Sequence, residues 1–234
     1  NGGDGNDRLE PGAGNNIVDG GAGIDTLILT GAKSSYNFIA ANGSTYLVGE
    51  EGASRIVNVE NISFAGENLA FEALASSLTA FDGLRYAASH ADLLAAFGTD
   101  APAATLHYVG SGFAEGRDAK GFDGLQYAAS YGDLATAFGT DAQAATNHYI
   151  TTGFAEGRSA DNFDGLRYIA SNADLITAFG SDDDMAAWHY IEAGRAEGRS
   201  LDSFDGLQYA ASYGDLATAF GTDAQAATNH YITT

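Results

Sequence analysis

Residues 2–28 read GGDGNDRLE, PGAGNNIVD and GGAGIDTLI, which are three nonapeptides in tandem. Each nonapeptide begins with a glycine-rich turn that exposes backbone carbonyl oxygens. Each then has an acidic or amide residue at its sixth position and an apolar residue, Leu9, Val18 or Leu27, at its eighth. A period of nine residues with the apolar positions in phase predicts a stack of short strands whose apolar side chains point inward.

The three nonapeptides match the template G-G-x-G-x-D-x-U-x and in this they resemble the RTX family of hemolysin-type calcium-binding proteins. The resemblance implies a short parallel β-roll in which two nonapeptides make one coil, so that turns on one edge lie 18 residues apart, as Asp7 and Asp25 do. Such turns offer the hard oxygen ligands that Ca²⁺ prefers. The implied ligands are the carboxylates of Asp7 and Asp25 and the carbonyls of Gly3, Gly5, Gly21 and Gly23, with Asn1, Asp4 and Asp19 as weaker candidates.

The middle nonapeptide departs from the template at two positions. Pro11 replaces the first glycine, and Asn16 replaces the aspartate. An amide is a weaker ligand than a carboxylate for a hard cation, so this edge of the stack should bind calcium poorly or not at all. We therefore expect one good calcium site.

The composition describes an acidic protein without disulfides. The chain has 234 residues, a formal net charge of -21, 31 glycines and no cysteine. This charge makes nucleic acid an improbable partner, and it indicates a chain that folds where millimolar calcium offsets the repulsion between carboxylates. There is no apolar run long enough for a transmembrane helix. The family resemblance implies type I secretion and an extracellular or cell-surface location.

Both ends of the sequence interrupt a repeat, as expected for a fragment of a longer protein. Asn1 reads as the last residue of a preceding nonapeptide, and the chain stops at Thr234 where the equivalent residues 150–152 continue into GFAEGR at 153–158. We therefore expect a longer parent protein.

Residues 31–68 predict a β-rich cap on the open end of the stack. Runs of β-branched and aromatic residues are separated by Gly and Asn turns, which is typical of short antiparallel strands. A stacked sheet with an open edge needs such a closure. The predicted strands are 26–30, 36–40, 44–48 and 55–59, and residues 69–80 are expected to form a short helical linker.

From Phe81 the motif Phe-Asp-Gly-Leu recurs every 41 residues, at Phe122, Phe163 and Phe204. The recurrence defines four copies, residues 81–121, 122–162, 163–203 and the truncated 204–234, and it predicts an all-α, solenoid-like array. In the first copy Asp82 and Asp100 are expected N-caps, Ser89 and Asp92 an expected capping box, and Gly98 and Gly112 expected helix stops. Residues 122–152 and 204–234 are identical in sequence.

Two further features of the copies invite a functional interpretation. The motif Glu-Gly-Arg at 115–117, 156–158 and 197–199 gives each junction an acid and a base that can bridge copies. One histidine per copy precedes a tyrosine, at His107, His148, His189 and His230. Single histidines separated by a whole copy do not give the clustered ligands of a zinc site, so we expect each imidazole to pack between helices and to bond a carboxylate or carbonyl.

The sequence therefore predicts a mixed fold, with a short calcium-binding β-roll and a β-rich cap followed by helical copies. The expected function is that of a calcium-dependent extracellular structural or adhesive protein, such as a surface-layer, filament or adhesin element. Its expected partners are further copies of itself and cell-surface polysaccharide. A repeated surface does not offer the unique constellation of an active site, and no catalytic motif is present, so we do not expect an enzyme. Two alternatives stay open, a non-catalytic C-terminal region of a secreted hydrolase and a carbohydrate-binding module that uses Tyr108, Tyr149, Tyr190 and Tyr231.

Overall fold

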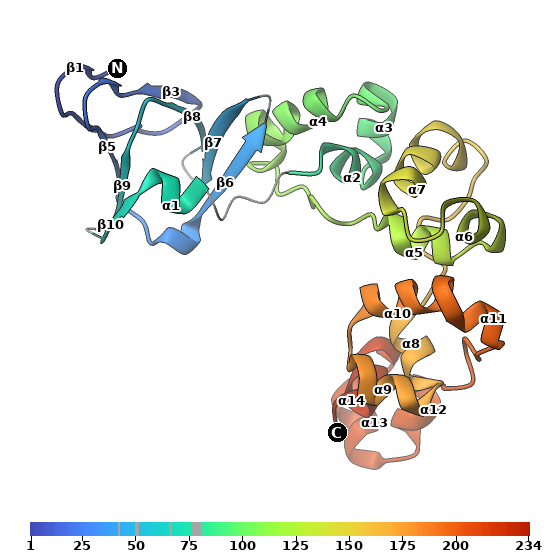
Figure 1. Cartoon of the computed structure of the whole chain (residues 1–234). Coiled ribbons are helices and arrows are strands. Elements are labelled where there is room, and N and C mark those ends of the chain that lie inside the picture. The colour runs from blue at the N-terminus through green and yellow to red at the C-terminus, as the bar shows by residue number, and fades with distance from the viewer. Residues whose placement is uncertain (42, 50–51, 66, 76–80) are drawn as a thin grey trace. The chain divides into compact units, whose positions relative to one another are not determined.

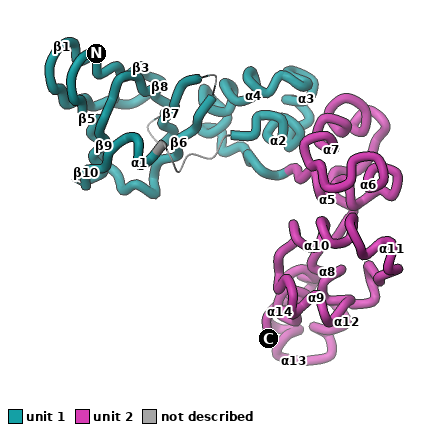
Figure 2. The backbone as a smooth tube through the Cα atoms, viewed as in Figure 1, with its two compact units in different colours: residues 1–121 teal, residues 122–234 magenta. Residues whose placement is uncertain are grey.

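The computed structural model describes residues 1–41, 43–49, 52–65, 67–75 and 81–234. Strands fill the N-terminal region and helices fill the remainder, so the expected order of a β-rich region followed by a helical array is confirmed (Figure 1). The chain divides into two compact units, residues 1–121 and 122–234 (Figure 2). The division falls between the first and second helical copies.

The nonapeptides form short strands that pair in parallel with an offset of 18 residues. Gly3 lies opposite Gly21, and Arg8 lies opposite Thr26. The strands are β1 (Gly3–Asp4), β2 (Arg8–Leu9), β3 (Asn16–Asp19), β4 (Gly21–Ala22) and β5 (Thr26–Leu29). Each turn therefore meets the turn two nonapeptides further along the chain.

The strands that follow extend this stack into two four-stranded sheets, ordered β10-β9-β5-β2 and β3-β8-β7-β6. The expectation of antiparallel strands is right for β6, β7 and β8, but β5 pairs in parallel with β2 and β9, and β8 pairs in parallel with β3. These parallel pairs arise because β8 and β9 continue the two edges of the nonapeptide stack. The strands are β6 (Tyr36–Ala41), β7 (Ser44–Gly49), β8 (Gly52–Val57), β9 (Asn61–Phe64) and β10 (Glu67–Ala70).

The apolar residues of the nonapeptides lie in the core of the β-rich region. Val18 and Leu27 pack with Ile56, Ile62 and Phe64 from the following strands. Leu27 and Ile62 are fully buried. The expected linker at 69–80 begins as the end of β10 and continues as helix α1 (Phe71–Ala75), and residues 76–80 lie outside the described residues.

Each helical copy has three short helices. They are α2 (Gly83–Ala88), α3 (Ala91–Phe97) and α4 (Ala101–His107) in the first copy, and α5 (Gly124–Ala129), α6 (Gly132–Phe138) and α7 (Ala142–His148) in the second. The third copy has α8 (Gly165–Ala170), α9 (Ala173–Phe179) and α10 (Asp183–His189), and the fourth has α12 (Gly206–Ala211), α13 (Gly214–Phe220) and α14 (Ala224–Thr233). A five-residue π-helical segment follows the third helix in the first three copies, at Tyr108–Gly112, Tyr149–Gly153 and Tyr190–Gly194, and the short α11 (Arg195–Glu197) follows the last of these.

Three of the expected helix boundaries in the first copy are confirmed. The Asp82 carboxylate accepts a hydrogen bond from Arg85 N at 2.9 Å, and Asp100 accepts one from Ala103 N at 3.0 Å, so both residues are N-caps. Gly98 ends α3 with a φ of 51°.

Two expected boundaries are wrong. Ser89 does not open α3, because α2 continues to Ala88 and the Ser89 hydroxyl donates back to Arg85 O at 2.8 Å. Helix α3 follows His90, whose side chain makes no capping hydrogen bond. Gly112 does not end α4, which ends at His107; it is instead the last residue of the π-helical segment that follows, and Gly112 O accepts a hydrogen bond from Arg117 N at 2.9 Å.

Successive copies within residues 122–234 pack in one manner. The third helix of a copy lies on the first helix of the copy before it, α10 on α5 and α14 on α8. A backbone amide of the later copy donates to a serine hydroxyl of the earlier one, Phe163 N to Ser130 Oγ at 2.9 Å and Phe204 N to Ser171 Oγ at 3.0 Å. The repeated bond indicates that these two junctions have the same geometry.

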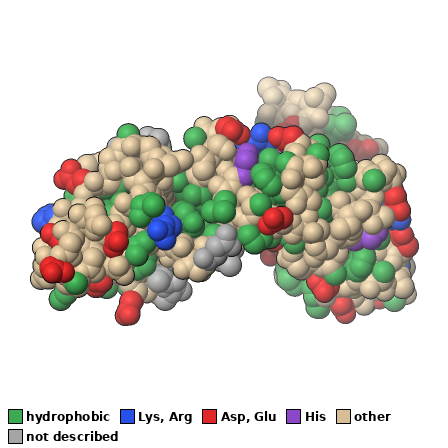
Figure 3. Space-filling model, turned by 90° about the horizontal axis from the view of Figure 1, so that it is seen from above, with side chains coloured by type: hydrophobic (Ala, Val, Ile, Leu, Met, Phe, Trp, Pro, Cys, Tyr) green, Lys and Arg blue, Asp and Glu red, His purple; other side chains and the backbone are tan. Residues whose placement is uncertain are grey.

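In residues 1–121 the first copy packs against the sheet that contains β6, β7 and β8. Val109 of the π-helical segment is buried with Ile39, Val48 and Ala53 of these strands. Asn15, in the middle nonapeptide, donates from Nδ2 to Gly110 O at 3.0 Å. Acidic side chains are spread over the face shown in Figure 3 and basic ones are few, in keeping with the net charge of -21.

Candidate metal centre

The structure brings the predicted glycines of the first and third nonapeptides together. Gly3 pairs with Gly21, and Gly5 N donates to Ala22 O at 2.8 Å beside Gly23. All four glycines have positive φ angles between 98° and 144°, a region that side chains disfavour. Glycine is therefore required here for the turns to stack and to expose their carbonyl groups.

Asp7 and Asp25 lie one above the other on the same edge of the stack. Asp7 N donates to Asp25 Oδ1 at 2.8 Å. Asp25 is completely buried, and Oδ2 of both aspartates is buried without a hydrogen-bond partner among the described residues. A buried carboxylate oxygen without a donor is costly, so this arrangement fits a cation that binds at these two atoms.

Two glycines leave space beside these carboxylate oxygens. A Cβ atom at Gly2 would lie 2.5 Å from Asp7 Oδ2 and would collide with Gly20 O. A Cβ atom at Gly20 would lie 2.5 Å from Asp25 Oδ2 and would collide with Asn58 O. The absence of a side chain at Gly2 and Gly20 thus lets each carboxylate oxygen lie close to a backbone carbonyl. The nonapeptide template does not point to the carbonyls of Gly20 and Asn58.

A third acidic residue continues the same column. Asn61 pairs with Thr26, which places Glu60 next to Asp25, and Asp25 N donates to Glu60 Oε2 at 2.7 Å. This bond repeats the one from Asp7 N to Asp25. The sequence analysis missed Glu60, although it directly precedes a strand just as Asp7 and Asp25 do.

The middle nonapeptide fills its own turn with an amide group. Asn16 Nδ2 lies within hydrogen-bonding distance of three carbonyl oxygens of its turn, 3.1 Å from Gly14 O and 3.4 Å from both Gly12 O and Ala13 O. The amide hydrogens therefore stand where a cation would otherwise meet these oxygens. This geometry gives a physical basis for the expectation that this edge binds calcium poorly.

The weaker candidates lie apart from the buried carboxylate oxygens. Asn1 and Asp4 are exposed. Asp19 is half-buried, and its Oδ1 accepts a hydrogen bond from Asn58 Nδ2 at 2.9 Å. The described residues contain no cluster of three or more His, Cys, Asp or Glu side chains able to hold a metal ion. The predicted site differs from such a cluster, since it combines two carboxylates with backbone carbonyls.

The histidines of the copies form hydrogen bonds with tyrosines, which are buried in the first three copies and half-buried in the fourth. The hydroxyl of Tyr86 lies 3.0 Å from His107 Nδ1, and the pairs Tyr127–His148, Tyr168–His189 and Tyr209–His230 repeat this contact at 3.0, 2.8 and 3.0 Å. Burial raises the pKa of Tyr86, Tyr127 and Tyr168 to about 12. The partner is thus a tyrosine hydroxyl and not the expected carboxylate or carbonyl, but the expected packing between helices is present.

The tyrosines proposed for sugar binding stack on the phenylalanine of the Phe-Asp-Gly-Leu motif. The ring centroids of Phe122 and Tyr149 are 4.6 Å apart, and those of Phe204 and Tyr231 are 4.4 Å apart. Tyr149 is buried, Tyr108 and Tyr190 are half-buried, and Tyr231 is exposed. This stacking favours a packing role for these rings.

The Glu-Gly-Arg motifs do not bridge copies. Arg158 pairs with Glu156 at 2.7 Å and with Asp133 at 2.9 Å, and both acids lie in its own copy. Arg117 and Arg199 make the equivalent pairs with Asp92 and Glu115, and with Asp174 and Glu197. The arginine ties the closing turn of a copy to the start of its second helix, because the chain after the π-helical segment folds back over the same copy.

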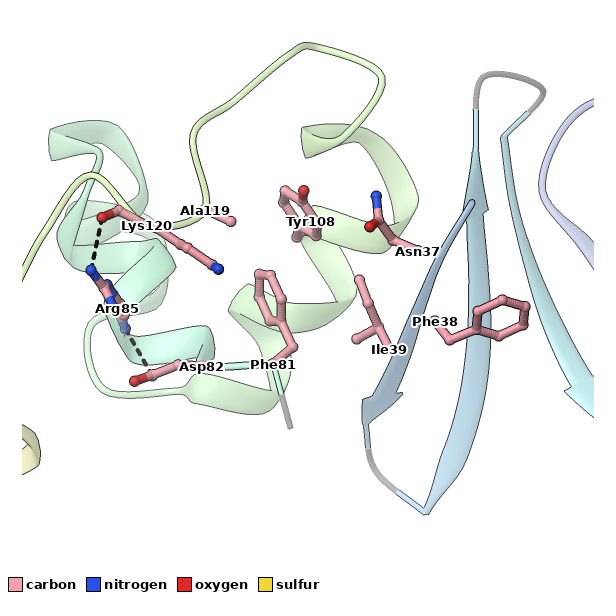
Figure 4. Close-up of a pocket in the computed structure, with 9 residues that line it drawn as sticks. All are labelled: Asn37, Phe38, Ile39, Phe81, Asp82, Arg85, Tyr108, Ala119 and Lys120. Atoms are coloured by element: carbon pink, nitrogen blue, oxygen red, sulfur yellow. Dashed lines mark hydrogen bonds between the residues drawn. The ribbon is translucent and has the colours of Figure 1, made fainter. Parts of the chain in front are cut away.

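A pocket of about 370 Å³ lies between β6 and the first helical copy. Figure 4 shows the rings of Phe81 and Tyr108 side by side on the helical side, with Ile39 facing them from the strand. Arg85 also lines the pocket, and its guanidinium donates to Lys120 O at 3.2 Å. The pocket contains none of the predicted calcium ligands.

No protein-family model and no curated protein matches this chain. Among the described residues, no helix has the length and apolar character needed to cross a membrane.

Proposed function

We propose that this chain is part of a calcium-dependent extracellular protein of the RTX type, exported by type I secretion, with a structural or adhesive role. The observation that carries the proposal is the pair of buried Oδ2 atoms of Asp7 and Asp25, which have no hydrogen-bond partner among the described residues and lie on one edge with a glycine and a backbone carbonyl close to each. Among protein cations, Ca²⁺ is the one best suited to a set of carboxylate and carbonyl oxygens without nitrogen or sulfur ligands.

In this proposal the nonapeptides form a short β-roll that calcium locks. The carboxylates of Asp7 and Asp25 hold the ion, and glycine carbonyls of the stacked turns complete the set. The positive charge of the ion would balance the negative charge of the buried carboxylates. A ligand that binds only the folded state at a hundredfold excess over its Kd adds about 2.7 kcal/mol to stability. The folded β-roll is therefore favoured outside the cell, where calcium is abundant.

The helical copies, three of 41 residues and a truncated fourth, then serve as a stacked array that projects another domain from the cell or connects neighbouring chains. The interface from α10 to α5 recurs from α14 to α8, which is how a repeat protein extends in one dimension. Self-association into a layer or filament and binding to cell-surface polysaccharide belong to the same proposal. The proposal assigns no catalytic role to these residues.

The experiment that tests this proposal combines far-UV circular dichroism with sedimentation velocity, in millimolar calcium and after chelation. We expect strand signal to appear with calcium and the sedimentation coefficient to rise. Asp25→Asn should abolish both changes, and Asp4→Asn, which alters an exposed acid of the same turns, should keep them. Calcium-independent spectra of the wild-type chain would contradict the proposal.

A further inference from the structure

The fourth helical copy and part of the second have the same sequence in different surroundings. Residues 204–234 are identical to residues 122–152. In the second copy, α5 is covered by α10 of the third copy. Among the described residues, no later copy covers α12 in the same way. Where a residue of 122–152 contacts the third copy, its equivalent in 204–234 shows the same residue without that contact.

Burial of the apolar residues differs strongly between the two segments. Ala129 is 6% exposed and packs with Leu125 in a cluster of third-copy residues, whereas their equivalents Ala211 and Leu207 are exposed, Leu207 to 44%. Three further pairs differ in the same direction, Phe122 and Phe204, Leu134 and Leu216, and Ala135 and Ala217. Tyr131 and Tyr149 are covered by residues 154–162 of their own copy, so their exposed equivalents Tyr213 and Tyr231 do not report on the third copy. We call the exposed apolar residues Leu207, Ala211 and Ala217 the α12 face.

The third copy covers the matching face of the second with complementary polar groups as well. The backbone amide of Phe163 donates to Ser130 Oγ at 2.9 Å. The Arg195 guanidinium donates to Gly132 O at 2.9 Å and to Thr136 Oγ1 at 3.2 Å. A following copy therefore supplies hydrogen-bond donors to acceptors that the earlier copy presents.

All of these acceptors recur at the α12 face. Ser212, Gly214 and Thr218 occupy the positions of Ser130, Gly132 and Thr136. The local hydrogen bond is also the same: Thr218 Oγ1 donates to Gly214 O at 2.8 Å, and Thr136 Oγ1 donates to Gly132 O at 2.8 Å. The α12 face is therefore a preformed copy of an interface that is already occupied elsewhere in the chain.

We propose that the α12 face binds one more helical unit of the same 41-residue class. The third helix of that unit would pack on α12 in the way that α10 packs on α5. The partner needs small apolar residues on that helix, as at Ala186 and Ala187, which are fully buried. It also needs a backbone amide for Ser212 and an arginine for Gly214 O. A second α12 face is a poor partner, since it would bring acceptors against acceptors. The inference is independent of calcium.

The test extends the full chain by a copy of residues 153–203 placed after Thr234. The new join repeats the native sequence around Thr152 and Gly153, since the residues before it are identical. Amide hydrogen exchange is followed in residues 204–234 and 122–152, distinguished by peptides that begin at Ser203 or Gly121. We expect exchange in 204–234 to slow about tenfold or more in the extended chain and to approach that of 122–152.

A matched control carries the same extension with the change equivalent to Ala187→Glu, which places a charge on the docking helix and should remove the protection. Unchanged exchange in 204–234 with the unaltered extension would overturn the proposal. A concentration-dependent dimer of the original chain that Leu207→Glu abolishes in chelator would also overturn it, because the face would then belong to a second copy of the chain. A failure of calcium binding leaves these readouts unaffected.

Discussion

At the scale of single residues, the sixth position of each nonapeptide contrasts a carboxylate with an amide. Asp7 and Asp25 each have a buried oxygen without a donor among the described residues, whereas Asn16 donates to the carbonyls of its own turn. In the proposed function a cation meets the oxygens of the first kind of turn, and amide hydrogens meet those of the second. Exchanging Asp and Asn at this position should therefore add or remove an ion.

The first prediction is that Asn16→Asp creates a second calcium requirement. The change removes the amide hydrogens from the carbonyls of Gly12 and Gly14 and adds a carboxylate at the matching place. We expect the variant to be less stable than the wild type in chelator, by about 1–3 kcal/mol for the lost hydrogen bonds, and to regain stability in calcium. Thermal melts with and without calcium measure this. Equal melting temperatures of variant and wild type in chelator would contradict it.

The second prediction concerns the glycine that ends each π-helical segment. A Cβ atom at Gly112 would collide with the hydroxyl of Tyr86, which is held beside His107, whereas nothing lies within 4 Å of a Cβ atom at Gly110. Gly112→Ala should destabilise the chain by about 1–3 kcal/mol because the side chain overpacks a buried contact. Gly110→Ala is the matched control in the same segment and should change stability little. Urea unfolding followed by tyrosine fluorescence compares the two, and equal midpoints would refute the prediction.

Some site residues could be read from the sequence and others could not. The template identified Asp7, Asp25 and the paired glycines, since their spacing alone sets which turns meet. The carbonyls of Gly20 and Asn58 were missed because the direction of a carbonyl depends on how the turns stack. Glu60 was missed because it lies 35 residues from Asp25, and only the pairing of β9 with β5 brings it into the column.

At the scale of elements, the arginine of each Glu-Gly-Arg motif stabilises its own copy. The hydrogen bond from Arg158 lowers the pKa of Asp133, and Arg199 does the same for Asp174. A lowered pKa gives stability that is present above the usual aspartate pKa of 3.8 and is lost as the pH falls below it. These exposed pairs therefore contribute to folding at neutral pH and fade in acid.

The pKa of Asp183 shifts in the opposite direction, upward. It occupies the position that is alanine in the other copies, Ala101, Ala142 and Ala224, and its Oδ1 is buried without a hydrogen-bond partner among the described residues. Burial and nearby carboxylates, with Asp164 foremost, raise its pKa to about 6. The folded state therefore favours the protonated acid, and this contribution to stability is lost as the pH rises from 3.8 through 6.

The third prediction is that Asp183→Ala stabilises the chain above pH 6. Removing an ionised, partly buried carboxylate should raise the melting temperature at pH 8 by about 2–4 °C, the effect of 1 kcal/mol in a chain of this size, and should have little effect near pH 4. Melting temperatures across this range measure the difference. Asp215→Ala, at an exposed position, is the control. A gain for Asp183→Ala that is equal at both pH values would argue against the mechanism.

The helices were more predictable than their ends. Asp82, Asp100 and Gly98 follow local capping rules, and these boundaries were found from the sequence. The capping box at Ser89 failed because its hydroxyl donates to Arg85 O in the preceding helix, a local bond that competes with capping. The α-helix expected to run to Gly112 ends at His107 and continues as a π-helical segment, in which Gly112 leaves room for the Tyr86 hydroxyl, a tertiary contact that local patterns do not contain.

At the scale of the whole chain, residues 1–121 contain both the nonapeptide repeats and the first helical copy. The nonapeptide stack continues into the β-sheets, and the first helical copy packs on those strands through Val109. Residues 122–234 form a separate compact unit. We propose that calcium acts on the first unit, where the buried Oδ2 atoms of Asp7 and Asp25 have no hydrogen-bond partner among the described residues, and that the second unit folds without it.

The fourth prediction follows from this division. Removing calcium should lower protection against amide exchange in residues 1–75, because the buried carboxylates lose their counter-charge, and should leave residues 122–234 unchanged. Hydrogen exchange is measured in calcium and in chelator, and each measurement reports the protection of residues 1–75 and of residues 122–234 in the same chain. Equal loss of protection in the two units would contradict the division.

The most direct test of the account is the calcium stoichiometry of the intact chain, measured by isothermal titration calorimetry. The account predicts that the wild-type chain binds one calcium ion at the edge formed by Asp7 and Asp25, and that Asp25→Asn abolishes this binding whereas Asp4→Asn keeps it. Undiminished calcium binding by Asp25→Asn, or no binding by the wild-type chain, would contradict the central claim.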